Sequence, residues 1–358
     1  MLLLGDICIA EADRICLDSR LIEIFKSNIS ACNLEGPINL KKSFNVKNLK
    51  MHNSSEIIDY FDVLNVKIVG IANNHIFDWG NKSVLSTISF LEEKGIKSVG
   101  YRFRGKSKID SVKIIEDNKI YSFYAFGWPI ISCKKPSLIS PGINPLDEVN
   151  INYYIENILP NISNNVIKVV YMHWCYEMEP YIQPLHRDFA KKLIDAGVQI
   201  IVGSHPHVPG PIEKYKGGFI FHTLGNFLYS SEKFCNGKLK FPKVSNSELM
   251  IEINGLRDIK VHKLELKDNY LKLVSTYQIP ENIKKFTKYP ITLSSRGYDK
   301  WYRAWSEKRS RFLPVFSTES NFLKKKFFNF MIFLRMFLIK TMILFKIKNP
   351  AKRRSLKN

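Results

Sequence analysis

Histidine side chains follow three apolar, strand-like runs of this chain. The sequence I-A-N-N-H-I-F-D occupies residues 71–78, V-V-Y-M-H-W occupies 169–174, and I-V-G-S-H-P-H occupies 201–207. These runs hold four of the eight histidines: His75, His173, His205 and His207. A strand that ends in histidine or asparagine presents an imidazole or amide at the edge of a sheet, where open α/β folds hold ligands and metals. The concentration of imidazoles at strand ends therefore predicts a metal site.

Two carboxylates and an amide lie at the ends of the earlier strand-like runs. Asp6 belongs to the first run, Glu35 to the second and Asn74 to the third. Mixed oxygen and nitrogen donors suit Zn, Mn or Fe(II) and argue against an all-sulfur site. A carboxylate that bridges neighbouring ligands is what a two-metal hydrolytic centre needs, because two cations can hold both the attacking and the leaving oxygen. The residues predict one or two divalent metal ions.

Strand-like and helix-like segments alternate over the first 230 residues, which predicts a layered α/β sheet with helices on both faces. The main expected strands are Leu2–Ile9, Ile29–Leu34, Val66–Ala72, Val166–His173, Gln199–Val202 and Phe219–Leu224. The main expected helices are Ser54–Leu64, Asn81–Lys94, Asp147–Ile158 and Leu185–Ala196. We expect Gly225-Asn226 to form a turn, because both residue types tolerate positive φ.

The chain after residue 230 has a different character. Three strand-like runs between 247 and 279 predict an antiparallel addition to the same domain. Residues 281–320 show no clear periodicity, so no element is assigned there. The six cysteines are scattered singly, which fits a reducing compartment and not a disulfide framework. The N-terminus has no basic region before its apolar run and is expected to be a first strand rather than a signal peptide.

The C-terminal segment 321–358 is basic and hydrophobic. The chain carries a net charge of +21, and residues 296–358 contribute +14 of it, from 17 Lys/Arg and 3 Asp/Glu. Residues 324–348 predict a basic amphipathic helix that lies on an anionic membrane surface. The alternative is a helix docked on the protein's own core with a solvated basic face. No uncharged apolar stretch of membrane-spanning length is present, so we expect a peripheral protein on the cytoplasmic side of the membrane.

Nine short blocks occur in order between residues 2 and 230. They are G-D-I (5–7), N-L-E-G-P (33–37), A-N-N-H-I-F-D-W-G (72–80), H-W-C-Y-E (173–177), P-Y-I-Q (180–183), L-I-D-A-G (193–197), G-S-H-P-H-V (203–208), P-I-E (211–213) and L-G-N-F (224–227). With these blocks, the chain resembles the CapA-type capsule and poly-gamma-glutamate synthesis family of the calcineurin-like metallophosphatase superfamily.

The resemblance implies a four-layer metallophosphatase-like α/β sandwich of mixed sheets flanked by helices. The expected organisation is a domain at 1–280, with its motif core at 2–230 and the strand addition at 247–279. Residues 281–320 stay unassigned, and 321–358 form the basic helical tail. The implied metal ligands are Asp6, Glu35, Asn74, His173, His205 and His207. His75, with Asp78 nearby, resembles the histidine that faces the leaving group as an acid. Asn33, Glu177 and Gln183 are candidates for substrate binding.

Two positions depart from the superfamily pattern. Cys8 stands where a histidine usually follows the first aspartate by two residues, and it is either a soft ligand or a buried structural cysteine. Cys175 stands where the H-W block usually has glycine. These departures weaken the expectation of hydrolysis more than they weaken the expectation of metal binding.

Two functions of different class fit these observations. One is a metal-dependent, phosphoesterase-like hydrolase acting in capsule, poly-gamma-glutamate or other surface-polymer production. The other is a non-catalytic metal-binding subunit of a membrane-associated polymer synthesis machinery. Nucleic-acid binding is not expected, because no recognised module is present and the excess charge is confined to the tail.

Overall fold

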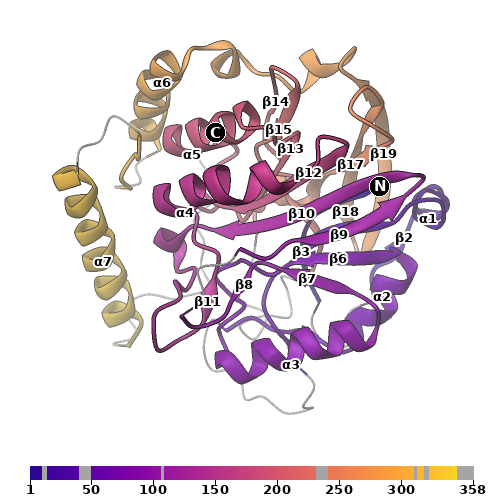
Figure 1. The fold of residues 1–358 in the computed structure, drawn as a ribbon, viewed down its shortest axis with the longest axis horizontal. Coiled ribbons are helices and arrows are strands. Elements are labelled where there is room, and N and C mark those ends of the chain that lie inside the picture. Colours follow the sequence, from indigo (N-terminus) through magenta and orange to yellow (C-terminus); the bar gives the residue numbers. More distant parts are fainter. Residues whose placement is uncertain are drawn as a thin grey trace.

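Two β-sheets pack against each other in the computed structural model of this chain (Figure 1). The structure describes residues 1–9, 14–39, 50–105, 109–230, 241–309, 313–317 and 322–344. Across the interface, the Tyr171 hydroxyl of one sheet donates to the Ala31 carbonyl of the other at 2.8 Å. Helices cover the outer faces, so the expected four-layer α/β sandwich of mixed sheets is confirmed.

The first sheet joins a parallel half to an antiparallel half. Its strand order is β2 (Cys16–Leu17), β19 (Tyr270–Ile279), β18 (Ile259–Lys267), β17 (Ser247–Ile253), β1 (Leu2–Cys8), β3 (Ser30–Leu34), β6 (Val66–Gly70) and β7 (Lys97–Val99). A further strand, β16 (Asn226–Tyr229), pairs in parallel with β1. The strands β17, β18 and β19 are antiparallel, as predicted for the addition at 247–279.

The second sheet is parallel in its centre and antiparallel at both edges. Its order is β14 (Ile212–Tyr215), β15 (Gly218–Phe221), β13 (Ile200–Ser204), β12 (Val166–His173), β10 (Lys119–Gly127) and β9 (Val112–Glu116). Two short pairs lie outside both sheets: β8 (Tyr101–Arg102) with β11 (Gly142–Ile143), and β4 (Ile38–Asn39) with β5 (Asn53–Ser54).

Side chains along β10 alternate between two hydrophobic cores, one on each face of the second sheet. Phe123 and Ala125 belong to the core between the sheets, whereas Tyr124 and Phe126 belong to the core under the outer helices. Successive side chains of a strand point to opposite faces. A strand covered on both faces is therefore largely apolar, which explains the apolar run at residues 123–126.

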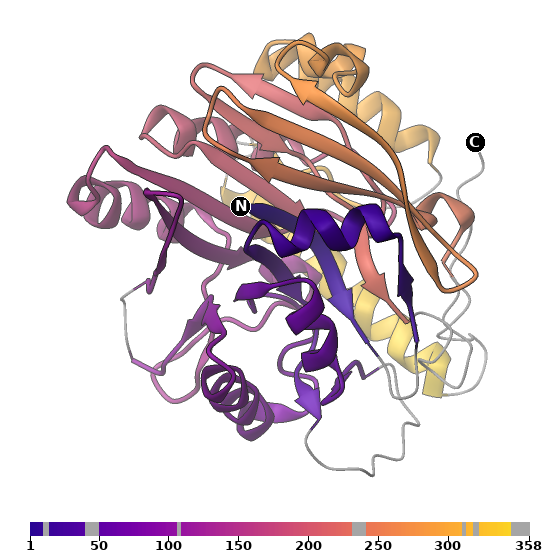
Figure 2. The same ribbon diagram turned by 90° about the vertical axis from the view of Figure 1, so that its right-hand side faces the viewer.

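Helices lie along the outer faces of the two sheets (Figure 2). On the second sheet lie α4 (Glu148–Tyr153) and α5 (Pro184–Asp195), which begins with proline at its first position, where no backbone donor is lost. On the first sheet lie α1 (Ser19–Lys26), α2 (Ile57–Val63) and α3 (Gly80–Glu93). Fully buried residues on these helices, such as Phe25 and Leu91, join the main core.

The unassigned region 281–320 contains helix α6 (Ser295–Lys308), which buried polar contacts hold against α5. Arg187 of α5 forms a bidentate pair with Glu213 at 2.7 and 2.8 Å. Its guanidinium also donates to the carbonyls of Ile291 and Leu293 and lies 4.5 Å from the centre of the Tyr298 ring. The guanidinium therefore has partners on β14, on the chain leading into α6 and on α6 itself.

Most sequence-based boundaries differ from the structure by one to three residues, and three of the differences change the element itself. The helix expected at Asp147–Ile158 is α4 followed by a π-helical turn at Tyr154–Ile158. The strand expected at Phe219–Leu224 ends at Phe221. The turn expected at Gly225-Asn226 is limited to Gly225, which has φ +82°, because Asn226 already begins β16.

The hydrophobic helix of the tail is α7 (Phe322–Leu344). The remainder of the tail, 345–358, lies outside the described residues. No helix in the described part of the chain combines the length and the apolarity needed to span a bilayer.

Candidate metal centre

The ends of strands from both sheets converge on one buried cluster. Asp6 lies near the end of β1, Glu35 follows β3, His173 ends β12, and His205 and His207 follow β13. None of these five residues is more than 3% exposed. The first sheet thus contributes carboxylates and the second contributes imidazoles. The sequence prediction that these residues meet at strand ends agrees with this placement.

Two glycines allow backbone segments beside the cluster to pack against each other without a side chain between them. A Cβ atom on Gly5 would lie 2.1 Å from the Gly225 carbonyl oxygen, and one on Gly203 would lie 1.9 Å from the His222 carbonyl oxygen. Both distances are far below van der Waals contact, so a larger residue would push the strands apart. The glycines of the G-D-I and G-S-H-P-H blocks are therefore required by backbone packing around the cluster.

The two histidines after β13 have an unusual backbone. His205 has φ +92° and His207 has φ +60°, in the region that non-glycine residues rarely adopt. Such conformations cost about 1–3 kcal/mol each and persist only where the surroundings hold them. The strain brings both rings of this short segment into the cluster, with centroids 5.9 Å apart.

Two groups of donor atoms share Glu35. One group comprises Glu35, His173 and His205, the other comprises Asp6, Glu35 and His207, and in each group the donor atoms lie within 4.8 Å of one another. Asn74 adds an oxygen to the first group, with its Oδ1 2.7 Å from His173 Nε2. Carboxylate, amide and imidazole donors in this arrangement fit two divalent ions that share one carboxylate.

Hydrogen bonds orient Asp6 within the cluster. Its Oδ1 accepts from Asn33 Nδ2 at 2.8 Å, and its Oδ2 accepts from the His205 backbone N–H at 2.9 Å. Burial raises the pKa of Asp6 to about 7, although both hydrogen bonds act in the opposite direction. Burial and the neighbouring imidazoles lower the pKa of His173 well below its usual value. A neutral His173 is the form that can ligate a metal, and a cation beside Asp6 would favour its carboxylate form.

His75 and Asp78 form a hydrogen-bonded pair at the more open side of the cluster. His75 Nδ1 lies 2.8 Å from Asp78 Oδ2, which also accepts from the Met51 backbone N–H at 2.8 Å. His75 Nε2 lies 3.7 Å from Glu35 Oε1. Both side chains of the pair are 19% exposed. The second nitrogen of His75 therefore faces the cluster from its accessible side.

The three residues expected to bind substrate have different surroundings. Asn33 is buried and bonds to Asp6, so it positions a ligand residue. Gln183 is also buried, but its amide donates to the Tyr302 hydroxyl at 2.9 Å and accepts from the Phe316 backbone at 3.1 Å. These contacts give Gln183 a structural role. Glu177 lies half-buried in the loop after β12, and its substrate-binding role stays a prediction.

The two departing cysteines lie among buried side chains. Cys8 packs in an apolar cluster with Met51 and Tyr229, and burial raises the pKa of its thiol well above the usual value. Among the described residues, the candidate ligand groups do not include it, which favours its structural interpretation. Cys175 has φ +67°, a conformation that glycine adopts without strain, and its Sγ lies 3.4 Å from His186 Nδ1.

Three residues beside the candidate ligands were not identified from the sequence, and two of them contact a ligand side chain directly. Asn226 Oδ1 lies 2.8 Å from His207 Nδ1, and Ser204 Oγ lies 3.0 Å from His173 Nδ1. Asn73 donates to the Leu34 carbonyl at 2.7 Å, directly before Glu35. All three residues lie in sequence blocks that carry the family resemblance, A-N-N-H, G-S-H-P-H-V and L-G-N-F, and this was the available signal.

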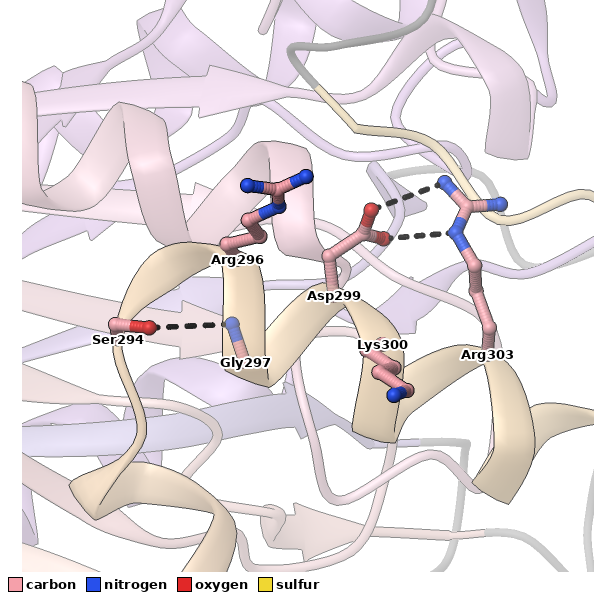
Figure 3. Close-up of a pocket in the computed structure, with 6 residues that line it drawn as sticks. All are labelled: Ser294, Arg296, Gly297, Asp299, Lys300 and Arg303. Carbon is pink, nitrogen blue, oxygen red and sulfur yellow. Dashed lines mark hydrogen bonds and ion pairs between the residues drawn. The ribbon is translucent and has the colours of Figure 1, made fainter.

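A separate hollow of about 440 Å³ lies on helix α6 (Figure 3). Its lining residues are Ser294, Arg296, Gly297, Asp299, Lys300 and Arg303. Asp299 forms an ion pair with Arg303 at 3.0 Å, and Ser294 caps the helix through the Gly297 N–H. None of the predicted site residues lines this hollow.

Comparison with known proteins places the chain among capsule synthesis proteins. It is 30% identical over 209 residues to the PGA biosynthesis protein CapA of Bacillus subtilis, covering 57% of this chain and 53% of that protein. It is 29% identical over 208 residues to the capsule biosynthesis protein CapA of Bacillus anthracis, covering 55% and 49%. The chain thus spans about half the length of these curated relatives.

The chain is also distantly similar to solved structures. The crystal structure of the calcineurin-like phosphoesterase YfkN from Bacillus subtilis matches with a TM-score of 0.39 and 13% identity, over 86% of this chain and 97% of that one. The family described as bacterial capsule synthesis protein PGA_cap matches residues 17–231, which include every predicted site residue except Asp6. The match covers more than half of the sequence, and the chain belongs to this PGA_cap family.

Proposed function

We propose that this protein is a metal-dependent, phosphoesterase-like hydrolase that acts in the synthesis of capsule, poly-gamma-glutamate or another surface polymer. The observation that carries the proposal is the position of Glu35, whose carboxylate belongs to both groups of candidate ligands. Two relatives named for capsule or PGA biosynthesis support the polymer context. We expect Mn, Zn or Fe as the metal, in one or two sites.

The residues of the cluster divide into ligands and proton-handling groups. Asp6, Glu35 and His207 would hold one ion, and Glu35, Asn74, His173 and His205 would hold the other. A bound ion would supply a nucleophile by lowering the pKa of water and would withdraw charge from a phosphoryl oxygen. The strained backbone at His205 and His207 fixes two of the imidazoles before any ion arrives, which reduces the reorganisation needed on binding.

His75 is proposed to protonate the leaving oxygen. Asp78 accepts a hydrogen bond from Nδ1 of its ring and orients the ring, while the Met51 N–H holds the carboxylate in place. The proton on Nε2 then points toward the region beside Glu35. A group with this geometry can act as a general acid, whose contribution is typically about 10²–10⁴-fold in rate.

Metal analysis joined to a phosphoester assay tests this proposal. We expect protein purified from cells grown with added Mn and Zn to retain one or two ions per chain. It should hydrolyse a generic phosphodiester or phosphomonoester, lose that activity with chelator and regain it with metal. Protein that stays metal-free under these conditions and shows no hydrolysis would contradict the proposal.

A non-catalytic role in a polymer synthesis machinery is the second candidate. Cys8, which replaces the usual histidine and packs among apolar side chains, favours this function because it removes one expected ligand. A protein of this kind would bind metal and support polymer production without turnover. Polymer production in cells carrying His75→Asn separates the two candidates, because only the enzyme depends on that proton donor.

Helix α7 supports a further proposal, that the protein lies on an anionic membrane surface. Phe328 packs against Phe316 with ring centroids 5.5 Å apart, and Ile332 is buried. The opposite side is apolar and exposed, through Leu323, Phe327, Phe330, Met331, Phe333, Leu334, Phe337 and Leu338. The helix contains no acidic residue. An exposed apolar face of this kind in a basic segment suits the headgroup region of an anionic bilayer.

Two charges placed on this face should abolish membrane binding. We expect the double variant Phe330→Asp, Phe337→Asp to bind vesicles of anionic phospholipid at least about 100-fold more weakly than the wild type, because two aromatic rings no longer enter the bilayer. Both rings are 58% exposed, so the fold should not change. Co-sedimentation with vesicles, at low and high salt, measures the effect.

A matched control is available in a loop remote in sequence. Leu138 and Ile139 are 87% and 86% exposed, and the variant Leu138→Asp, Ile139→Asp makes the same change in charge and also removes two exposed apolar side chains. It should bind vesicles like the wild type. Equal loss in both double variants would show a general charge effect, and no loss in either would remove α7 from membrane binding.

A further inference from the structure

Asn226 contacts the cluster of candidate metal ligands from the strand that pairs with β1. It is the first residue of β16 and lies opposite Asp6 in the parallel register. Its side chain is buried, with 4% exposure. The left-handed Gly225 precedes it, and the adjacent Phe227 packs its ring 5.9 Å from that of Phe25. The residues before and after Asn226 therefore both fix the position of this strand, and the Asn226 side-chain amide is directed at the cluster.

The two nitrogens of His207 have different neighbours. Nδ1 lies 2.8 Å from Asn226 Oδ1 and 3.6 Å from Asp6 Oδ2, both of which are acceptors. Nε2 lies 3.9 Å from Glu35 Oε1, the carboxylate shared by the two ligand groups. A neutral imidazole carries one proton, and it resides on the nitrogen that faces an acceptor at hydrogen-bonding distance. The Nε2 lone pair is then directed toward Glu35.

We propose that Asn226 is a positioning residue that keeps the proton of His207 on Nδ1 and thereby selects Nε2 as the nitrogen offered to a divalent metal. The inference rests on the proposed function for the metal, but the proton position is a property of the metal-free protein. Groups that hold the second nitrogen of a ligating histidine fix its tautomer and orientation, and their loss typically costs about 10–100-fold in metal affinity.

Three variants separate this role from a merely structural one. Asn226→Leu keeps the approximate size of the side chain and removes the acceptor, whereas Asn226→Asp keeps an acceptor oxygen. Phe227→Leu is the control, because it alters the same strand on the opposite face. Long-range ¹H–¹⁵N spectra of histidine-labelled, metal-free protein report the tautomer of His207, whose signals are assigned by their absence in His207→Gln. Titration with Mn²⁺ or Zn²⁺ reports affinity.

We expect wild type, Asn226→Asp and Phe227→Leu to show the Nδ1–H tautomer. Asn226→Leu should populate Nε2–H and bind the metal about 10–100-fold more weakly. An unchanged tautomer in Asn226→Leu would overturn the inference, and so would a changed tautomer with unchanged metal affinity. If the wild type binds neither metal, the proposed metal centre fails, and the tautomer spectra still decide whether Asn226 places the proton.

Discussion

Replacing His75 with asparagine is expected to lower phosphoester turnover by about 10²–10⁴-fold while the metal stays bound. His75 contacts the cluster only from its open side, 3.7 Å from Glu35 Oε1, and belongs to neither group of candidate ligands in the described residues. Asparagine keeps polarity at this position but cannot donate a proton to a leaving oxygen. Steady-state rates with a phosphodiester, together with metal content by mass spectrometry, measure the two effects separately.

His52→Asn is the matched control for this loss. The His52 ring packs edge-on against Trp79, with ring centroids 5.9 Å apart, so His52 lies beside the same loop as His75. Because His52 is not the proposed general acid, its replacement measures the effect of losing a nearby histidine alone. It should retain most of the turnover. Full activity in His75→Asn would remove His75 from the mechanism, and loss of metal together with activity would identify it as a ligand or a folding residue.

Replacing Glu35 with glutamine is expected to empty both metal sites. Glutamine has almost the same size, but it lacks the negative charge and the second acceptor oxygen that two cations would share. His205→Ala and His207→Ala each remove a donor from only one group, so each should lose one ion and keep the other. We expect the affinity for each affected ion to fall at least about tenfold. Metal-to-protein ratios after dialysis against buffered Mn²⁺ or Zn²⁺ provide the measurement.

Glu177→Gln makes the same chemical change in the loop after β12 and should keep the wild-type metal content. It also tests the substrate role predicted for Glu177, through a higher KM without metal loss. A Glu35→Gln protein with two ions at wild-type affinity would show that the carboxylate does not connect the sites. Loss of both ions in His207→Ala would show that the two sites bind metal cooperatively.

Much of the fold could be predicted because its central strands are largely apolar on both faces. The bounds of β12 (Val166–His173) were predicted to the residue, because a largely apolar run of this kind, with Lys168 as the one charged residue before His173, is typical of a strand in the middle of a sandwich. Helix α6 was not assigned, although its aromatic residues recur at the i, i+3, i+4, i+7 spacing of one helix face: Tyr298, Trp301, Tyr302 and Trp305. Its attachment also depends on buried polar contacts from Arg187 and Gln183, which apolar periodicity does not reveal.

The candidate ligands were easier to find in the sequence than the residues that contact them. Each ligand follows an apolar run, so local sequence marks it. Asn226 contacts His207 from a four-residue strand after a glycine, and that strand is too short to show alternation. The hydrogen bond of Asn33 to Asp6 also depends on how strands pair in space. Such contacts follow from strand order and register, which spacing along the chain does not reveal.

The division of donors between the sheets gives the proposed metal a mechanical role. Asp6 and Glu35 belong to the first sheet, whereas His173, His205 and His207 belong to the second. An ion held by both sets would act as a cross-link between the two layers at one end of the sandwich. At a free concentration about 100 times its dissociation constant, such an ion adds about 2.7 kcal/mol to the stability of the folded state. Metal supply would then govern how long the protein persists in the cell as well as its chemistry.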